Sequence, residues 1–215
     1  VIIDKYKGND EILTIPSVID GYPVTDISYA AFYQCTTLHE VVIPDTVTYI
    51  GYEAFSGCEN LETVTLSSGL TYLGSEAFAF CSSLNQIELP DGLTTIDSNA
   101  FVYCESLSSI AIPESVTCLN EGAFSYCSGL SSIQLPSGLT RLSRYQFLEC
   151  TSLTQIIIPD NVSVIEDSVF SGCSSLVQVH LPVNLTQFST ASAFKDCVKL
   201  SSIELPGFIT DIGSY

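Results

Sequence analysis

Cysteine is the chemically reactive residue with the most regular spacing in this chain of 215 residues. Neighbouring parallel strands lie about 5 Å apart, so stacked cysteines could form disulfides. Side chains in one parallel column point the same way, however, which opposes the roughly 90° dihedral angle of a disulfide. We therefore predict a ladder of free buried thiols, with Cys118 outside it and facing outward; disulfide bonding remains the alternative. Eight of the nine cysteines recur at intervals of 23 residues, with one interval of 24: Cys35, Cys58, Cys81, Cys104, Cys127, Cys150, Cys173 and Cys197.

Metal binding and catalysis find little support in the other reactive groups. A zinc site needs convergent ligands, and the chain contains no Cys-x-x-Cys or His-x-x-x-His pair. A catalytic histidine needs a nucleophile and an orienting group beside it, and neither His39 nor His180 has such partners in the pattern. We expect no more than a surface contact between His180 and Glu204. The predictions are a non-enzymatic protein, no metal and no cofactor.

These side chains must be positioned by an internal repeat, because the cysteine period is shared by other residue types. A leucine follows each repeated phenylalanine by six residues, two aliphatic residues come next, and a proline then follows in seven of eight units. Ser67 replaces that proline in one unit, and Gln146 and Val169 replace the alanine that usually precedes the phenylalanine. The repeated phenylalanines, each three residues before a ladder cysteine, are Phe32, Phe55, Phe78, Phe101, Phe124, Phe147, Phe170 and Phe194.

The spacing within a unit predicts a solenoid. Intervals of three residues are typical of tight 3₁₀-like turns or of extended threefold backbone, rather than of an α-helix. The two aliphatic residues two apart are typical of a short strand. A coil of 23 residues cannot bury its own apolar stripe, so successive coils must stack. We predict about nine coils in one domain over residues 1–215, which we expect to be part of a longer protein. Residues 1–27 are interpreted as an N-terminal cap or degenerate first coil, 28–205 as eight regular repeats and 206–215 as a truncated ninth repeat.

The repeat resembles the BspA-like leucine-rich repeat family over roughly residues 13–215. The segment VTYIGYEAFSGC at residues 47–58 carries the resemblance most completely. The family implies a leucine-rich repeat solenoid with a parallel β-sheet on the concave side and short helical or 3₁₀ turns on the other side. It also implies a secreted or cell-surface protein, for which adhesion to host proteins is the role usually proposed. The repeat motif itself carries structural residues and no ligand residues.

The predicted strand face offers the candidate binding residues. Outward positions between the buried aliphatic residues form two columns, and these columns are mostly neutral and polar. We expect this face to contact a protein or glycan, although a merely solvated face remains the alternative. The candidate contact residues are Glu40, Gln86, Glu88, Gln134, Gln155, Gln178, His180 and Glu204.

Aromatic residues also recur at equal repeat positions outside the predicted core. Phe80, Tyr103 and Tyr126 share one position in consecutive units, and Tyr49 and Tyr72 share another. Such stacks could hold a sugar or a protein partner, or could simply cover the turns of the coils. Both interpretations remain open at this stage.

Charge narrows the class of partner. The chain has 24 acidic and 6 basic residues, a formal net charge of −18, and no lysine or arginine between Gly8 and Thr140. Nucleic acid is excluded as an expected partner because phosphate recognition needs a basic surface. No run of 18 apolar residues is present, so we expect no membrane insertion. The acidic residues indicate either solubility or a cationic partner, and Asn161 and Asn184 begin glycosylation sequons.

These observations predict a protein-interaction or adhesion module, monomeric and located outside the cell or on its surface. The alternative is a passive spacer that holds another domain of a larger surface protein in place.

Overall fold

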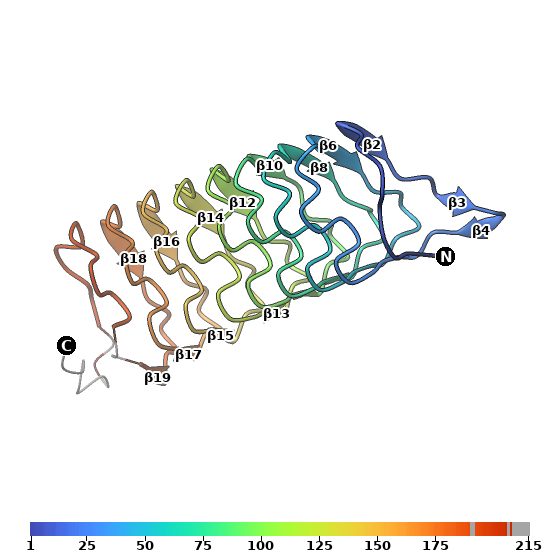
Figure 1. Ribbon diagram of the computed structural model, residues 1–215. Helices are drawn as coiled ribbons and strands as arrows, with labels where there is room; N and C mark the ends of the chain where they lie inside the picture. The colour runs from blue at the N-terminus through green and yellow to red at the C-terminus, as the bar shows by residue number, and fades with distance from the viewer. Residues whose placement is uncertain (190–191, 206, 208–215) are drawn as a thin grey trace.

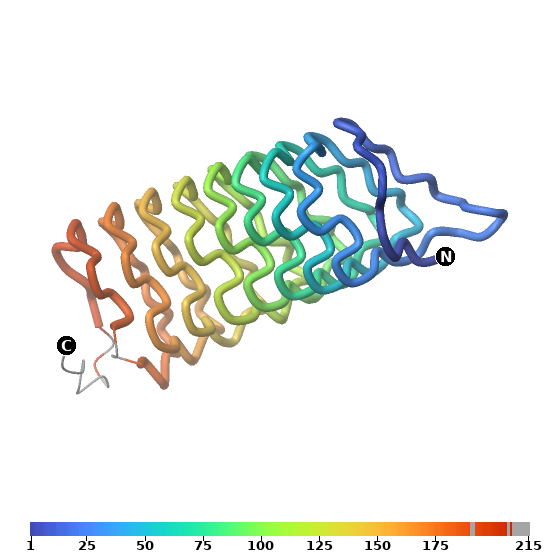
Figure 2. The backbone as a smooth tube through the Cα atoms, viewed as in Figure 1, coloured from blue at the N-terminus to red at the C-terminus, as the bar shows by residue number. Residues whose placement is uncertain are grey.

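The computed structural model describes residues 1–189, 192–205 and 207, and it shows a solenoid of parallel strands with about eight coils of about 23 residues (Figure 1). The coils stack one on the next along a single axis, as the backbone trace also shows (Figure 2). The predicted solenoid is therefore confirmed. About nine coils were predicted for the whole chain, and the predicted truncated ninth repeat lies outside the described residues except for Gly207.

One side of the solenoid, which we call the long-strand face, carries the strand that follows the repeated leucine. Equal positions of neighbouring coils pair in parallel, as Val41 pairs with Val64. Hydrogen-bonded ladders join the strands into sheets of four (β10-β8-β6-β2), two (β12-β14) and two (β16-β18). The strands are β2 (Ile12–Thr14), β6 (Glu40–Val42), β8 (Thr63–Thr65), β10 (Gln86–Ile87), β12 (Ser109–Ala111), β14 (Ser132–Gln134), β16 (Gln155–Ile157) and β18 (Gln178–His180).

A second side, the short-strand face, carries strands of two residues that come after the proline. They form a six-stranded sheet from β1 to β13 and a three-stranded sheet from β15 to β19. The strands are β1 (Ile2–Ile3), β5 (Asp26–Ile27), β7 (Tyr49–Ile50), β9 (Tyr72–Leu73), β11 (Thr95–Ile96), β13 (Cys118–Leu119), β15 (Arg141–Leu142), β17 (Val164–Ile165) and β19 (Gln187–Phe188).

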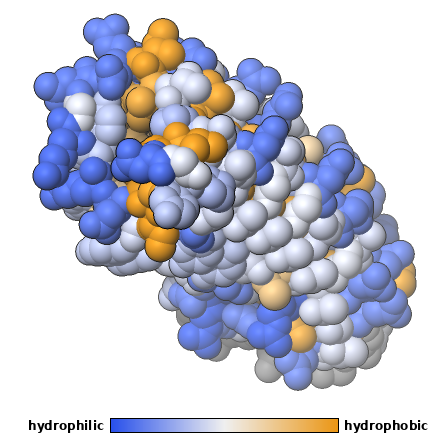
Figure 3. Space-filling view, turned by 90° about the vertical axis from the view of Figure 1, so that its right-hand side faces the viewer, coloured by the Kyte–Doolittle hydropathy of each residue, from blue (hydrophilic) through white to orange (hydrophobic). Residues whose placement is uncertain are grey.

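The N-terminal segment differs from the regular coils. Strands β3 (Val18–Ile19) and β4 (Tyr22–Pro23) form an antiparallel hairpin that projects from the solenoid (Figure 1). The ring of Tyr6 packs on the first core phenylalanine, Phe32, with a centroid distance of 5.1 Å. Seen from this end, the surface carries gathered hydrophobic residues (Figure 3), and the exposed side chains here include Ile2, Ile12 and Val18.

The predicted helical or 3₁₀ turns are wrong, because the described residues contain no helix. The segment around each core phenylalanine is a run of turns in which alternate N–H groups donate hydrogen bonds to the next coil and not within their own coil. The Ala54 N–H donates to Gly51 in its own coil at 3.3 Å, whereas the Phe55 N–H donates to Ala77 of the next coil at 2.8 Å. A helix would need all of these donors within the coil, so stacking replaces helical hydrogen bonds.

This turn ladder requires left-handed backbone at two positions of every coil. The residue two before each core phenylalanine has φ between 50° and 64°, and the residue two after it has φ between 56° and 76°. Only glycine adopts this conformation without strain, yet most of these positions hold other residues. The coil geometry therefore imposes the conformation regardless of residue type.

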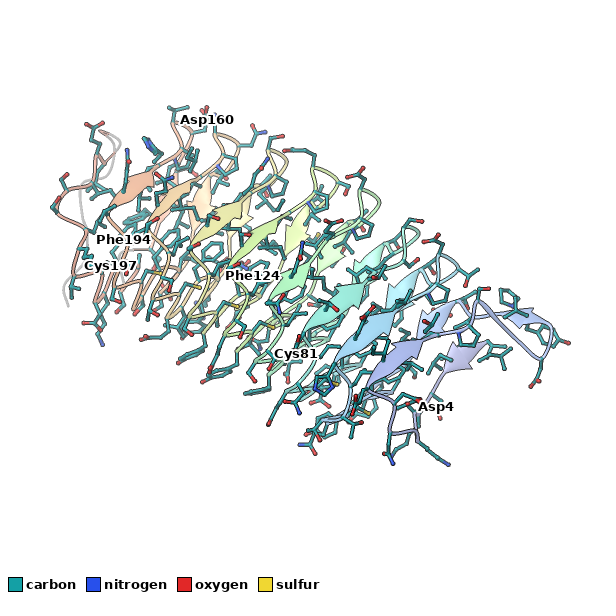
Figure 4. All side chains as sticks on the ribbon, turned by 90° about the horizontal axis from the view of Figure 1, so that it is seen from above. Asp4, Cys81, Phe124, Asp160, Phe194 and Cys197 are labelled. Atoms are coloured by element: carbon teal, nitrogen blue, oxygen red, sulfur yellow. The ribbon has the colours of Figure 1, made fainter. Side chains whose placement is uncertain are left out.

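The core is a continuous stack of aromatic rings. Neighbouring core phenylalanines have centroids 4.7–6.1 Å apart and planes within 10° of parallel. Phe32 to Phe170 are all fully buried in this stack, with leucine and cysteine columns beside it. The view from above shows Phe124 and Cys81 among the stacked side chains between the strands (Figure 4). Burial of these columns between coils is the main stabilising contribution expected for a solenoid.

Within the described part of the chain, one junction between coils lacks both strand ladders. Gln146 occupies an alanine position, is fully buried, and has no hydrogen-bond partner for either side-chain amide atom. At the same junction the Phe124–Phe147 distance is the longest in the stack, 6.1 Å, and neither β13 with β15 nor β14 with β16 is joined by a ladder. The amide side chain is larger than the methyl group of alanine, and it lies at the same junction as this wider spacing.

Candidate functional site

The long-strand face presents most of the candidate contact residues in the predicted columns. Gln155 pairs with Gln178, and Ile157 with His180, in the ladder between β16 and β18. Gln86 lies on β10, and Gln134 lies at the end of β14. Glu88 follows β10 directly, and Glu204 lies in a segment without strand structure.

Three shallow grooves run along this face, and they bring seven of the eight candidates together in groups. A groove of about 640 Å³ is lined by Gln86, Glu88 and the loop 90–92. A second, of about 480 Å³, is lined by Gln134 and Gln155. The third groove, of about 490 Å³, contains three more candidates: Gln178, His180 and Glu204.

The eighth candidate, Glu40, differs from the others. Its side chain is half-buried on β6, while the other seven candidates are exposed, and it lines none of these grooves. Exposed amide and carboxylate groups in a groove can donate and accept hydrogen bonds with a ligand. The seven clustered residues are therefore the better candidates for contact.

The expected contact between His180 and Glu204 is replaced by a different one. The side-chain amide nitrogen of Gln178 lies 2.8 Å from Nε2 of His180. Within residues 1–189, 192–205 and 207, His180 forms no ion pair. His39 lies with Nδ1 at 2.9 Å from the Thr37 carbonyl oxygen. Over the described ranges, no three His, Cys, Asp or Glu side chains gather in a way that could hold a metal ion.

Two carboxylates in the loops after the proline have a structural role that the sequence pattern did not indicate. Asp45 accepts hydrogen bonds from the N–H and hydroxyl of Ser68 in the next coil, at 2.9 and 2.8 Å. Glu114 accepts the equivalent pair from Ser137 at 2.8 and 2.7 Å. These hydrogen bonds lower the pKa of both carboxyl groups. These hydrogen bonds could have been predicted from the sequence, because each acidic residue directly follows the repeat proline and a serine stands 23 residues later.

The thiol ladder is confirmed, and its thiols are hydrogen-bonded. Seven ladder cysteines each donate from Sγ to the carbonyl oxygen of the core phenylalanine of the preceding coil, at 3.0–3.3 Å. All nine cysteines are free, and Cys118 is exposed as predicted. Burial raises the pKa of the Cys127 thiol to about 12, so this buried thiol is expected to remain protonated and unreactive at neutral pH.

The aromatic columns also form as stacks. The rings of Phe80 and Tyr103 lie 5.0 Å apart, and those of Tyr103 and Tyr126 lie 4.4 Å apart. Tyr49 and Tyr72 stack at 5.0 Å on the short-strand face. The rings of Tyr29 and Tyr52 form a further stack, with centroids 5.5 Å apart. This stack was not predicted, although the two tyrosines are one repeat apart in the sequence.

The Tyr72 hydroxyl donates to a carboxylate one coil away. Its hydrogen bond to Asp97 is 2.5 Å long and raises the pKa of Tyr72 to about 12. Asn120 donates to the other oxygen of the same carboxylate at 2.8 Å. This network ties three consecutive coils together, which supports a packing role for the Tyr49–Tyr72 column.

The described residues contain no helix that is long and apolar enough to cross a membrane.

Comparison with known proteins agrees with the repeat architecture. The model of the BspA type leucine rich repeat region matches residues 25–153 and 94–215, with six copies. A leucine-rich repeat protein of T. pallidum has 33% sequence identity and a TM-score of 0.74, over 93% of this chain and 82% of that chain. A leucine-rich repeat protein of Bacteroides ovatus has 26% identity and a TM-score of 0.64, over 94% and 76% of the two chains.

A leucine-rich repeat protein of Eubacterium ventriosum shares the fold, with 22% identity and a TM-score of 0.64 over 91% of this chain and 60% of that chain. No curated protein matches. The family model covers far more than half of the chain. The chain therefore belongs to the BspA-type leucine-rich repeat family.

Proposed function

We propose that this protein is a non-enzymatic interaction module that binds a protein or glycan through the long-strand face. The observation that carries the proposal is the grouping of seven exposed polar candidates in three grooves on that face. A secreted or cell-surface location and an adhesive role follow from the usual setting of the family. We expect the module to be monomeric.

The chemistry of the grooves supports a neutral, polar partner surface with some apolar content. Glutamine amides provide both donors and acceptors, so they can bond to peptide groups or to sugar hydroxyls. Ile157, with 70% of its surface exposed, adds an apolar contact beside Gln134 and Gln155. Interfaces of moderate affinity commonly combine such polar and apolar contacts.

A binding screen with face-specific variants tests the proposal. Arrays of glycans and of extracellular proteins would be probed with the native protein and with a variant that combines Gln134→Ala, Gln155→Ala, Gln178→Ala and His180→Ala. We expect a ligand whose binding weakens at least tenfold in this variant, equivalent to about 1.4 kcal/mol. The control combines Thr117→Ala and Thr140→Ala, two exposed positions elsewhere on the coils, and should bind normally. Equal ligand binding by both variants would contradict a binding role for the long-strand face.

The passive spacer remains the second candidate, and one observation favours it. Most neighbouring coils are connected by one or both strand ladders as well as by the turn ladder, and these hydrogen bonds together oppose bending of the rod. A spacer needs such stiffness and no ligand. Capture of one partner with micromolar or tighter affinity by the isolated protein would contradict this alternative.

A further inference from the structure

The column of Phe80, Tyr103 and Tyr126, which we call the aromatic ladder, combines exposure with an unfavourable backbone conformation. These residues have φ of 59°, 60° and 60°, in the left-handed region that bulky side chains rarely adopt. The same column holds Gly57 and Gly172 in other coils, where the conformation is free of strain. Three consecutive aromatic residues are therefore placed where glycine fits better.

The fold does not require aromatic rings at this position. The buried phenylalanine stack beneath the aromatic ladder is complete without it, since Phe78, Phe101 and Phe124 are fully buried. Other coils accept a range of residue types in the column, all with positive φ: Gln34, Gly57, Glu149, Gly172 and Asp196. Because the coil imposes the positive φ at every residue of this column, these three positions differ from the others only in the bulky aromatic side chain held in that conformation. Residues held in such unfavourable conformations are often found at functional sites.

The geometry of the rings indicates the kind of partner. Phe80 is 46% exposed, while Tyr103 and Tyr126 are partly exposed. Their planes are within 12° of parallel, so the rings cover one another's faces and leave mainly their edges for contact with a partner. A sugar stacks on a ring face, and apart from the outer side of Phe80 few faces are open. A row of edges and hydroxyls instead suits the side chains of a protein, for which tyrosine is a frequent contact residue.

Charge around the aromatic ladder favours a basic partner. No lysine or arginine occurs from Gly8 to Thr140, a span with sixteen acidic residues. The next basic residues, Arg141 and Arg144, form ion pairs with Glu166 and Asp167 and so turn toward the following coil. Glu149 occupies the position of the same column in the coil after Tyr126, so a carboxylate adjoins the end of the aromatic ladder. A lysine or arginine can lay its apolar stem along ring edges while its charge meets such a carboxylate.

We propose that the aromatic ladder is a docking surface, separate from the long-strand face, for a protein segment that carries lysine or arginine among apolar residues. This surface does not depend on the proposed function, because its residues lie on the turns and not on the strands.

Glycine substitution provides the test, since it removes the rings and relieves the backbone at the same time. The probes are three versions of one apolar peptide, which carry lysine and arginine, serine, or glutamate at the same positions. Binding of each peptide is measured by fluorescence anisotropy. We expect the basic version to bind at least tenfold more tightly than the acidic one, and a variant with Phe80→Gly, Tyr103→Gly and Tyr126→Gly to lose at least tenfold. The net charge is unchanged by these substitutions, so nonspecific attraction persists in the variant. Gln34→Gly, in the same column, is the matched control and should bind normally.

Stability measurements separate a docking role from a packing role. If the rings serve a partner, the glycine variant should melt at the native temperature or above it; if they serve the fold, its Tm should fall by several degrees. A second variant with glutamine at the three positions, as at Gln34, repeats the test without added chain flexibility. The proposal is overturned by a clear fall in Tm for both variants, by unchanged peptide binding, or by capture of a neutral oligosaccharide in place of the basic peptide.

Discussion

The thiol of Cys58 donates a hydrogen bond to the backbone carbonyl oxygen of Phe32, 3.1 Å away in the preceding coil. The same relation recurs up to Cys197 and Phe170, so the cysteine column is a series of contacts between coils. A small apolar side chain with a weak donor suits this place, because it fills the space beside the phenylalanine stack and satisfies a carbonyl group.

Replacing one ladder cysteine should therefore cost stability. Cys104→Ala removes the hydrogen bond to Phe78 and some packing volume, and we expect the free energy of unfolding to fall by about 1–2 kcal/mol. Urea unfolding followed by circular dichroism measures the change. Cys118→Ala, at the exposed cysteine, is the control and should stay within about 0.5 kcal/mol of the native protein. Equal losses of unfolding free energy for both variants would contradict a stabilising role for the cysteine ladder.

The thiols should differ sharply in reactivity. In the native protein near neutral pH we expect rapid alkylation at the exposed Cys118, slower alkylation at the half-buried Cys35, and almost none at buried Cys104 or Cys150. Burial raises the pKa of the last two thiols well above the usual range, which removes the reactive thiolate. Mass spectrometry after timed labelling checks the order, and fast labelling of a buried ladder position in folded protein would be the contrary result.

High pH should destabilise the protein through the same thiols. The Cys127 thiol has a pKa near 9 when exposed and about 12 in the fold, so above pH 9 the unfolded chain loses a proton that the folded chain retains. Stability is thus fully present below pH 9 and is lost as the pH rises toward 12. Tyr72, whose pKa is raised to about 12 by the hydrogen bond to Asp97, acts with the same sign. Thermal melts at increasing pH measure the loss. The Tm of a Cys127→Ala variant should fall less steeply with pH than that of the native protein. An identical fall in Tm would contradict a contribution of this thiol to the pH dependence.

Gln146 should be replaceable with a gain in stability. Gln146→Ala removes two buried amide atoms without partners and restores the residue found in most coils, so we expect a gain of about 1–3 kcal/mol in unfolding free energy. The control is Val169→Ala in the same column, where an apolar side chain is lost and stability should fall. A loss of stability with Gln146→Ala would show that the amide is satisfied in solution.

The comparison of prediction with structure is clearest at the repeat positions. The equality of spacing was enough to predict that Phe55 stacks between Phe32 and Phe78, because equal positions in a stacked coil must be neighbours. Equal spacing also predicted the tyrosine stacks and the outward columns. The helical turns were wrong because an N–H such as that of Phe55 has two competing acceptors, one in its own coil and one in the next.

The sequence by itself thus determined the period, the buried columns and the absence of basic residues over most of the chain. The tertiary structure alone decided the left-handed φ at Tyr103, the missing strand ladders at Gln146 and the grooves around Gln155 and Gln178. The physical reason is that hydrophobic periodicity is a local property of the chain. Hydrogen-bond direction and surface shape depend instead on the neighbouring coil, which contributes half of every such contact.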